Sequence, residues 1–540
     1  MLGAGYTMEL LAMSQPTLWE LVEAACRAWP ERVALQLDRE TMTYATLGSA
    51  ASAVAGNYRR LGVEPGDRVV CQVSNRAEHL VAAAGAWAAR AIHVSADHDL
   101  TGHELAGLVG RTGARVLVLE ARSRATDPLE AARAVAKRHP RTQVVLVGEP
   151  QDRGWLQFSE LTGVASSAVP PARPEPASVP MPGPKPEEPA FILPTSGTTG
   201  VPKLPLGCHG PFAQGWARTA SRLGFGPEDV HLAHLRLSHG FGLSTATMAL
   251  ATGGRLVLLP RFSPEEVLRV VASERVSVLN GTPAHFLLLA ERFDQTRHDL
   301  SSLRAGVGTA STFPTRIRRW IVEELGMEFM VMYGSSEGVS VVTTDRDDIL
   351  AGSVGSPRPG GVIVVGPDRK ALPAGRVGEI AFSRARWKVA YWGQAEDPPS
   401  QGGWYYTGDL GRLDPDGRLY VLGRIKHQID RGGLKVDPGE VEAALLSCPE
   451  VADAAVVGLR HSVLGETVCA CVVSTPGEAP TLQGLTERLS SVLAPYKLPE
   501  GLCLLKAIPR TDMGKVDRDR LTSLVGVQAE VEMRASANGR

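Results

Sequence analysis

Residues 195–203 (Thr-Ser-Gly-Thr-Thr-Gly-Val-Pro-Lys) combine the residue types that bind phosphate groups. Glycines let backbone N–H groups turn toward a phosphate, the hydroxyls donate further hydrogen bonds, and Lys203 supplies a positive charge. The spacing differs from the P-loop of ATPases, which needs Gly before the lysine and Ser or Thr after it, whereas Pro202 and Leu204 stand here. The segment predicts a polyphosphate-binding loop; a flexible surface turn is the alternative.

Two further segments offer groups that suit the rest of a nucleotide. Residues 331–338 (Val-Met-Tyr-Gly-Ser-Ser-Glu-Gly) end an apolar run with an aromatic ring, hydroxyls and a carboxylate. Tyr333 can stack on a base, Ser336 can bond a phosphate and Glu337 can hold Mg²⁺, although a plain turn after a strand explains the same residues. The sequence Tyr-Thr-Gly-Asp at 406–409 predicts a turn whose carboxylate accepts hydrogen bonds from a ribose or caps the turn locally.

Two basic segments follow later in the chain. Residues 423–433 (Gly-Arg-Ile-Lys-His-Gln-Ile-Asp-Arg-Gly-Gly) carry cations and a glycine pair, and residues 509–518 (Pro-Arg-Thr-Asp-Met-Gly-Lys-Val-Asp-Arg) place Lys515 after a glycine-containing turn. Taken singly, each is equally compatible with a solvated surface. Their chemistry therefore depends on which elements bring them to the phosphate-binding segments.

The elements that must position these groups alternate between buried strands and amphipathic helices. Short apolar runs at 115–120, 143–149 and 190–193 predict strands, whereas the spacing of apolar residues at 131–139 and 264–274 predicts helices. Such alternation is typical of an α/β fold. The third of these strands leads directly into the phosphate-binding segment.

Changes in composition divide the chain. Residues 170–189 contain nine prolines in twenty positions and predict an extended connector. Residues 404–429 alternate around Asp-Pro-Asp-Gly at 414–417, which predicts a β-hairpin, and Asp437 with Pro438 predicts the start of a helix. We therefore expect a large domain over residues 1–425 and a smaller one over residues 426–540.

Composition and charge exclude several classes of partner. The 57 Lys and Arg against 58 Asp and Glu give a net charge of −1, so no global field favours nucleic acid or an anionic membrane. The apolar run Leu80–Ala96 is interrupted by Arg90 and falls short of the roughly 20 residues that a membrane span needs. Seven cysteines without a Cys-x-x-Cys pair argue against a disulfide framework and a zinc site. A cytoplasmic location is expected.

The five chemical segments, in this order, resemble the adenylate-forming superfamily of acyl-CoA synthetases, carrier-loading adenylation domains and luciferases. The resemblance runs from about Thr17 to Leu521. It implies an α/β fold with a large N-terminal domain of layered α/β subdomains plus a β-barrel-like part, and a small mobile C-terminal α+β lid. It also implies an ATP-dependent carboxylic acid:CoA ligase that forms an acyl-AMP and then a thioester, with ATP, Mg²⁺ and coenzyme A as cofactors.

The resemblance implies a role for each matching residue. Lys515 would reach the reacting carboxylate and the α-phosphate, Glu337 would bind Mg²⁺, and Lys426 would be the hinge of the lid. The residues implied to bind ATP are Thr195, Ser196, Gly197, Thr198, Thr199, Gly200 and Lys203 at the β- and γ-phosphates, Tyr333 at adenine, Ser336 at the α-phosphate, and Asp409 and Arg424 at the ribose. Gly432 and Gly433 would line the path of the pantetheine arm.

Three positions depart from the family pattern. Ser336 replaces the usual Thr and keeps the hydroxyl, Leu204 replaces the usual Gly, and His427 stands where an acidic residue is common. Only the last is expected to alter the behaviour of the lid.

The acid site is expected from three segments, residues 237–244, 280–286 and 306–311. Aromatic-acid members often keep a histidine at the position of His239, although a core histidine is the alternative. No Asp lies between Leu237 and Thr247, which argues against α-amino acids, and Gly240 stands where dihydroxybenzoate activators carry Asn. The residues expected to line the acid are His239, Gly240, Gly308, Ala310 and Gly334. A benzoate-like acid, plain or with an ortho amino or hydroxyl group, is the prediction; a medium-chain or alicyclic acid is the alternative.

The acyl acceptor is expected to come from outside the chain, because no carrier domain follows residue 521. Free CoA is the simpler acceptor, and a separate acyl carrier protein is the alternative. A nucleotide-binding pseudoenzyme without turnover is a third reading, against which the presence of Glu337, Asp409, Arg424 and Lys515 argues.

Overall fold

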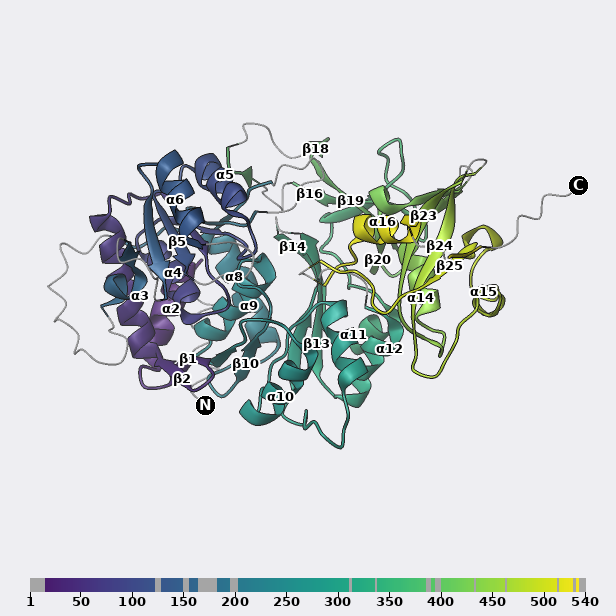
Figure 1. The fold of residues 1–540 in the computed structure, drawn as a ribbon, viewed down its shortest axis with the longest axis horizontal. Helices are drawn as coiled ribbons and strands as arrows, with labels where there is room; N and C mark the ends of the chain where they lie inside the picture. Colours follow the sequence, from purple (N-terminus) through teal and green to yellow (C-terminus); the bar gives the residue numbers. More distant parts are fainter. Residues whose placement is uncertain are drawn as a thin grey trace, which may run out of the picture.

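The structure is a computed structural model that describes residues 15–121, 128–148, 155–163, 182–194, 203–309, 313–335, 338–384, 390–393, 400–431, 434–461, 464–511, 514–527 and 531–533. Its elements form a large N-terminal domain and a smaller C-terminal domain, which lies at the right-hand end of Figure 1. Among the helices described, none combines the length and the apolar character that crossing a bilayer requires.

An eight-stranded sheet forms the first layer of the N-terminal domain. Its spatial order is β17 (Ala390–Tyr391), β9 (Pro205–Cys208), β8 (Pro189–Ile192), β4 (Ile92–Ser95), β3 (Arg68–Gln72), β5 (Val116–Glu120), β6 (Gln143–Val147) and β7 (Leu156–Gln157). The strands from β8 to β7 run parallel. β5, β6 and β8 confirm the three strands predicted from apolar runs.

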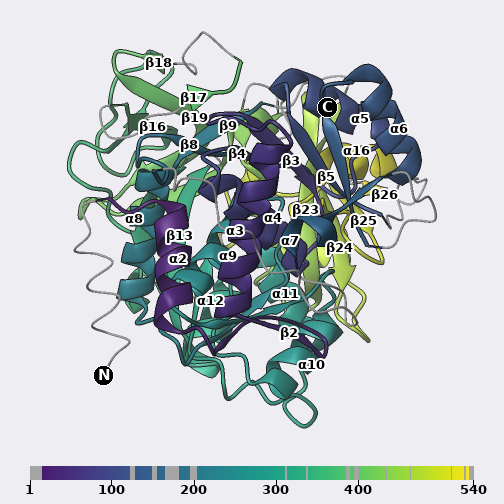
Figure 2. The ribbon, with the colours of Figure 1, turned by 90° about the vertical axis from the view of Figure 1, so that its left-hand side faces the viewer.

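Helices cover both faces of this sheet because its strands are apolar on both sides. Alternate residues divide between two cores: Val69 and Cys71 of β3 pack with α2 (Leu18–Ala28), α3 (Tyr44–Arg60) and α4 (Ala77–Ala88), whereas Val70 packs with α5 (Gly102–Thr112) and α6 (Pro128–Arg138). α6 confirms the helix predicted at 131–139. Figure 2 shows α2 and α3 side by side in front of the sheet.

A second layer brings later segments beside the first. β10 (Val230–Ala233) and β11 (Arg255–Leu258) pair in parallel, β1 (Val33–Leu37) and β2 (Glu40–Thr43) extend the sheet, and an isolated bridge at Val278 connects it to β12 (Ala305–Gly308). β13 (Glu328–Ser335) and β14 (Gly338–Thr343) complete that edge. The helices of this layer are α8 (His209–Arg222), α9 (Gly240–Ala251), α10 (Pro264–Glu274), α11 (Pro283–Arg292), α12 (Thr315–Arg319) and α13 (Arg346–Ala351).

α10 shows how the sequence sets a boundary in this layer. Ser263 accepts a hydrogen bond from the backbone N–H of Glu266, and Pro264 occupies the first helical position. The helix therefore begins at the predicted residue.

An antiparallel sheet follows as the β-barrel-like part. β15 (Val362–Val365), β16 (Gly378–Ser383), β19 (Trp404–Leu413) and β18 (Ser400–Gln401) pair in this order, and β20 (Leu419–Arg424) pairs with β19. The turn at 414–417 lies between β19 and β20, where the sequence predicts a hairpin. Tyr333 of β13 packs into the core of this sheet with Phe382 and Tyr405, so the two sheets meet at the end of β13.

The described part of the C-terminal domain has one sheet and three α-helices. The strands are β21 (Ile429–Arg431), β22 (Leu434–Val436), β23 (Val451–His461), β24 (Gly465–Ser474), β25 (Gly501–Leu504) and β26 (Val531–Met533), and the helices are α14 (Pro438–Leu445), α15 (Leu482–Leu489) and α16 (Arg518–Val527). A single 3₁₀ turn, Ile425–His427, follows β20 and leads into this domain. The layered α/β domain, the barrel-like sheet and the small α+β domain confirm the expected fold class.

The start of α14 packs directly on the last strand of the N-terminal domain. The Asp437 side chain accepts a hydrogen bond from the N–H of Gly439 at 2.7 Å and caps the helix, as predicted. A Cβ added at Gly423 would lie 2.2 Å from Oδ2 of Asp437, so a larger residue at this position of β20 would displace the carboxylate. Asp437 is 8% exposed, and among the described residues no group donates a hydrogen bond to its Oδ2.

Burial, together with the charge of Glu442, raises the pKa of Asp437 to about 6, against the opposing effects of the Gly439 N–H and Arg518. The folded protein therefore binds this proton more tightly than the unfolded chain, and ionisation above pH 6 costs stability. We expect Asp437→Asn, which keeps an oxygen for the Gly439 N–H, to stabilise the protein at pH 8 by about 2–3 kcal/mol. The gain should shrink as the pH falls through 6 and disappear near pH 4.

Melting temperatures at pH 8 and pH 4.5 measure this effect. Glu478→Gln, which removes an exposed carboxylate from the same domain, should leave the melting temperature unchanged at both pH values. An Asp437→Asn protein that melts no higher than the wild type at pH 8 would contradict the assignment.

Candidate functional site

Three predicted nucleotide-binding residues meet where β13 reaches the barrel-like sheet. Asp409 of β19 lies opposite Arg424 of β20, and the Arg424 Nε lies 2.5 Å from Oδ1 of Asp409. The hydroxyl of Tyr333, at the end of β13, donates to Oδ2 of the same carboxylate at 2.7 Å. Asp409 thus joins two segments that are 76 residues apart in the chain.

The segment 406–409 is not a turn, as the sequence suggested, but part of the continuous strand β19. Gly408 has a φ of +72°, a left-handed conformation that glycine adopts without strain, and the pairing with β16 shifts register between Glu379 and Ala381. The Thr407 hydroxyl donates to the carbonyl of Ile380 at 2.9 Å and accepts from the N–H of Asp409 at 3.0 Å. A β-bulge, rather than a turn, therefore directs Asp409 toward Tyr333.

The electrostatics of this carboxylate reflect its burial. Burial raises the pKa of Asp409, whereas Arg424, the Tyr333 hydroxyl and Lys515 favour its ionised form. Burial also raises the pKa of Tyr333 well above its ordinary value, and the negative charge of Asp409 adds to this effect. The tyrosine therefore keeps its proton and remains a hydrogen-bond donor.

Lys515 reaches this group from the C-terminal domain. Its loop closes on itself, because the N–H of Thr511 donates to the carbonyl of Lys515 and the N–H of Gly514 donates to the carbonyl of Thr511, each at 2.7 Å. Gly514 takes a φ of +72°, so the lysine follows a glycine-containing turn as the sequence predicts. Arg510 anchors the loop to Asp453 of β23 through two hydrogen bonds of 2.7 and 2.8 Å.

The surroundings of Lys515 are crowded and positive. Lys515 as a whole residue is exposed, yet the protein atoms around its ammonium lower its pKa, and the charges of Arg424 and Lys426 lower it further, whereas Asp409 opposes the shift. Three cations, Lys515, Arg424 and Lys426, thus lie near the single carboxylate of Asp409. Such an excess of positive charge suits an anionic ligand.

The loop of Lys515 rests on the N-terminal domain at the start of α11. A Cβ added at Gly514 would lie 2.9 Å from Cβ of Ala284 and 3.2 Å from Oγ1 of Thr282. Arg316 of α12 adds a second bridge, since its guanidinium donates to the carbonyl of Ala452 in the C-terminal domain and lies 3.8 Å from Glu291 of α11. The described structure therefore holds the Lys515 loop against α11, where the charges of Lys515 and Asp409 act on each other across the domain junction.

Lys203 is the last residue of the phosphate-binding segment and the one residue of it that the structure describes. It lies two residues before β9. Its ammonium is 5.7 Å from the ring centre of Tyr391, and the next residue, Leu204, is buried and accepts a hydrogen bond from the N–H of Trp392 at 2.8 Å. Leu204 thus replaces the glycine of the family pattern with a core residue. The predicted positions Thr195, Ser196, Gly197, Thr198, Thr199, Gly200, Ala310, Ser336, Glu337, Gly432 and Gly433 lie outside the described residues.

The residues predicted to line the acid fall on separate elements. His239 precedes α9 as its N-cap residue, and a Cβ added at the next residue, Gly240, would lie 2.9 Å from Leu193 at the end of β8. Gly334 lies in β13 next to Tyr333. The Cβ direction of Gly308 points at the rings of Phe313 and Phe329, at 2.5 and 2.7 Å, so that face of Gly308 belongs to the hydrophobic core.

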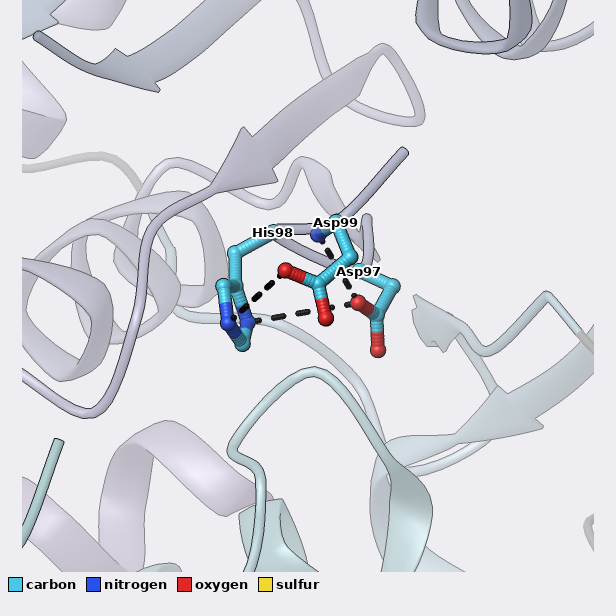
Figure 3. A group of neighbouring side chains, drawn as sticks. All are labelled: Asp97, His98 and Asp99. Carbon is cyan, nitrogen blue, oxygen red and sulfur yellow. Dashed lines mark hydrogen bonds and ion pairs between the residues drawn. The ribbon is translucent and has the colours of Figure 1, made fainter. Parts of the chain in front are cut away.

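A cluster of charged side chains lies beside His239, and the sequence did not predict it. Asp97, His98 and Asp99 follow β4 and lie close enough together to suggest a metal site (Figure 3). However, Arg236 donates to Oδ1 of Asp97 at 2.6 Å and to Oδ2 of Asp99 at 2.8 Å, and thereby supplies the counter-charge itself. The only signal in the sequence is a polar Asp-His-Asp triplet directly after a buried strand.

Comparisons with known proteins place this geometry in context. The family described as AMP-binding enzyme matches residues 22–392, and its C-terminal domain family matches residues 440–515. Triostin synthetase I of Streptomyces triostinicus is 34% identical, over 94% of this chain and 94% of that protein. The 2-hydroxy-7-methoxy-5-methyl-1-naphthoate–CoA ligase of Streptomyces carzinostaticus is 33% identical, over 94% of this chain and 93% of that protein.

The fold has close counterparts among solved structures. The crystal structure of the anthranilate CoA ligase AuaEII in complex with anthranoyl-AMP superposes with a TM-score of 0.82, over 94% of this chain and 97% of that protein. The two sequences are 24% identical, so this likeness concerns the fold alone.

Proposed function

Since the chain belongs to the AMP-binding enzyme family, we propose that it is an ATP-dependent ligase that joins a carboxylic acid to coenzyme A through an acyl-AMP. ATP, Mg²⁺ and coenzyme A are the cofactors of this reaction. The observation that carries the proposal is the packing of the Lys515 loop on α11, across the domain junction, where the charge of Lys515 acts on the Tyr333–Asp409–Arg424 group. One binding element thus comes from each domain.

The reaction needs this arrangement because a carboxylate is a poor electrophile. Its attack on the α-phosphate of ATP expels pyrophosphate and gives a mixed anhydride that a thiol can open. The barrier arises largely from bringing two anions together in line, which preorganised cations reduce. Among the described residues, we assign Lys515 as the cation that lies between the carboxylate and the α-phosphate and reduces their repulsion.

We assign the remaining nucleotide contacts as follows. Asp409 and Arg424 hold the ribose, Tyr333 stacks on adenine, and Lys203 with residues 195–200 holds the β- and γ-phosphates. Glu337 would hold Mg²⁺, which would neutralise charge on the phosphate oxygens, and Ser336 would bond the α-phosphate. The Tyr333–Asp409 hydrogen bond supports the ribose assignment, since it orients a carboxylate beside the aromatic ring before any ligand binds.

An aromatic acid is the proposed substrate. The relative from Streptomyces carzinostaticus is named for a hydroxylated naphthoate. His239 is the N-cap of α9, and Gly240 lies against Leu193, which directly follows β8. We therefore place the acid against the first turn of α9, with Gly334 next to the adenine-binding tyrosine. A cytoplasmic location fits the seven cysteines, all of which are free thiols.

A panel of substrates tests this function. Benzoates with and without ortho amino or hydroxyl groups, and fatty acids of C6 to C16, are offered with ATP and Mg²⁺ in a pyrophosphate-release assay, with and without CoA. Release with a benzoate, followed by a thioester when CoA is present, is the expected result. Pyrophosphate release only with fatty acids would show that the substrate is a fatty acid and not an aromatic acid. A thioester formed only with a purified carrier protein would show that the acceptor is a carrier protein and not CoA. No pyrophosphate release with any acid would indicate a pseudoenzyme.

Arg316 gives a prediction about the lid. Because its guanidinium bonds the carbonyl of Ala452 across the domain junction, it stabilises the arrangement in which Lys515 faces Asp409. A charge-assisted hydrogen bond contributes about 1.5 kcal/mol, so Arg316→Ala should lower the rate of acyl-AMP formation about tenfold. Conversion of supplied acyl-AMP to the thioester should be unchanged or faster.

Arg319→Ala is the matched control for this prediction. Arg319 lies on the same helix and is exposed, and the described residues give it no hydrogen bond to the C-terminal domain. It should leave both half-reactions unchanged. Equal losses in both half-reactions of Arg316→Ala would contradict a role in lid position.

A further inference from the structure

Asp97 and His239 are joined by a contact that links two loops of the N-terminal domain. The Nε2 atom of His239 lies 3.1 Å from Oδ2 of Asp97, and the Ser238 hydroxyl lies 3.4 Å from the same oxygen. The residues are 142 positions apart, and both side chains are more than half buried, with 28% and 22% exposed for His239 and Asp97. Among the described residues, no group is hydrogen bonded to the other ring nitrogen of His239.

The other oxygen of Asp97 is already committed. Arg236 donates to Oδ1 at 2.6 Å and the N–H of Asp99 donates to it at 3.0 Å. The Arg236 guanidinium can only donate hydrogen bonds, and it donates to Oδ1 of Asp97. Oδ2 therefore remains available to accept from the imidazole of His239. Burial alone would raise the pKa of Asp97, but the hydrogen bonds from His239 and Asp99 and the charge of Arg236 hold it below its ordinary value. Asp97 therefore remains an acceptor.

Two buried amide side chains hold the loops in place. Gln72, at the end of β3, donates to the carbonyls of Asp97 and Leu100, both at 3.0 Å. Asn75 donates to the carbonyl of Leu235 at 2.9 Å and accepts from the N–H of Leu237 at 2.9 Å. Both amides are 4% exposed, so the loops that carry Asp97 and His239 are fixed from inside the protein.

We propose that Asp97 is a positioning residue for acid binding, which holds His239 with its proton on Nε2 and leaves Nδ1 as an acceptor for an ortho hydroxyl or amino group of the acid substrate. This inference rests on the proposed function, in which His239 lines the acid site. A carboxylate that accepts from one ring nitrogen fixes both the tautomer and the orientation of a neutral imidazole. The cluster is thus a support for the acid site.

The variant Asp97→Asn keeps the size of the side chain and changes only the direction of its hydrogen bond to His239. Because Arg236 can only donate, it should retain the amide oxygen, and the amide NH₂ then faces Nε2 of His239. The imidazole must accept there, which moves its proton to Nδ1, so that Nδ1 donates and no longer accepts from the ortho group of the acid. We expect the KM for an acid with an ortho hydroxyl or amino group to rise about tenfold while the KM for ATP stays within twofold.

The experiment compares acid KM values from pyrophosphate release in four proteins: wild type, Asp97→Asn, His239→Ala and the double variant. If Asp97 acts through His239, Asp97→Asn should have no further effect in the His239→Ala background. Asp99→Asn is the matched control, because Asp99 shares the loop and Arg236 but has no contact with His239 in the described structure. It should leave the acid KM unchanged.

Three results would overturn the proposal: an unchanged acid KM in Asp97→Asn, the same rise in the His239→Ala background, or an equal rise in Asp99→Asn. If Asp97→Asn does not fold, Asp97→Ala enters the same cycle. A wild-type protein that releases no pyrophosphate with any acid would reject the proposed function itself. A wild type with acid-dependent release and no Asp97 effect would reject only this inference.

Discussion

Lys515→Ala should lower the rate of acyl-AMP formation by 10² to 10³, while the conversion of supplied acyl-AMP to its CoA thioester stays near the wild-type rate. Removing one preorganised donor from a developing charge typically costs about 2.7–4 kcal/mol of transition-state stabilisation. The lysine is assigned to the first step alone, because its loop would block the approach of a thiol. The loop itself should keep its shape, since the Thr511 N–H bonds the backbone carbonyl of residue 515.

Acid-dependent pyrophosphate exchange and the thioester half-reaction, measured separately, test this result. Lys506→Ala is the control, because Lys506 is an exposed lysine of the same domain that lies outside the Lys515 loop. It should leave both rates unchanged. Equal losses in the two half-reactions of Lys515→Ala would contradict the assignment of Lys515 to acyl-AMP formation alone.

The second large effect is expected at the hinge. Lys426 is the middle residue of the 3₁₀ turn Ile425–His427, whose typical φ of about −60° matches that of proline. Lys426→Pro should therefore keep the described arrangement and the rate of acyl-AMP formation. It should resist the backbone rotation that the thioester arrangement needs, at a cost of about 3 kcal/mol or about a hundredfold in thioester formation.

Lys426→Ala separates the backbone effect from the charge effect. The charge of Lys426 lowers the pKa of Lys515, so alanine tests that contribution while its backbone rotates freely. Only proline should slow the thioester half-reaction strongly. Unchanged thioester formation in Lys426→Pro would place the hinge elsewhere.

Strands and helices of the N-terminal domain were predictable because their patterns are local. The run at 115–120 has apolar residues on both faces, which a parallel strand between two helical layers requires, and β5 lies there. Ser263 and Pro264 fix the start of α10 through backbone geometry within one turn. Asp437 and Pro438 do the same for α14.

The partners of the site residues were less accessible to sequence reasoning. The glycine in Thr-Gly-Asp at 407–409 suggested a turn, but pairing with β16 and β20 makes it a bulge inside a strand. Gly308 is predicted to lie at the acid, and its Cβ direction meets two phenylalanine rings, which the sequence did not indicate. Neither outcome is encoded within a few residues, because each depends on which distant strand or side chain packs alongside.

The amino-acid sequence alone determined which groups are available: the hydroxyl-rich loop, Tyr333, Asp409, Arg424 and Lys515, with the family resemblance that orders them. Only the tertiary structure decided that Tyr333 and Arg424 share one carboxylate and that Lys515 faces it from another domain. The same holds for Asp97 and His239, which the chain separates by 142 positions. Local patterns fix backbone conformation over a few residues, whereas contacts across such distances arise only when buried sheets and amide side chains bring the loops together.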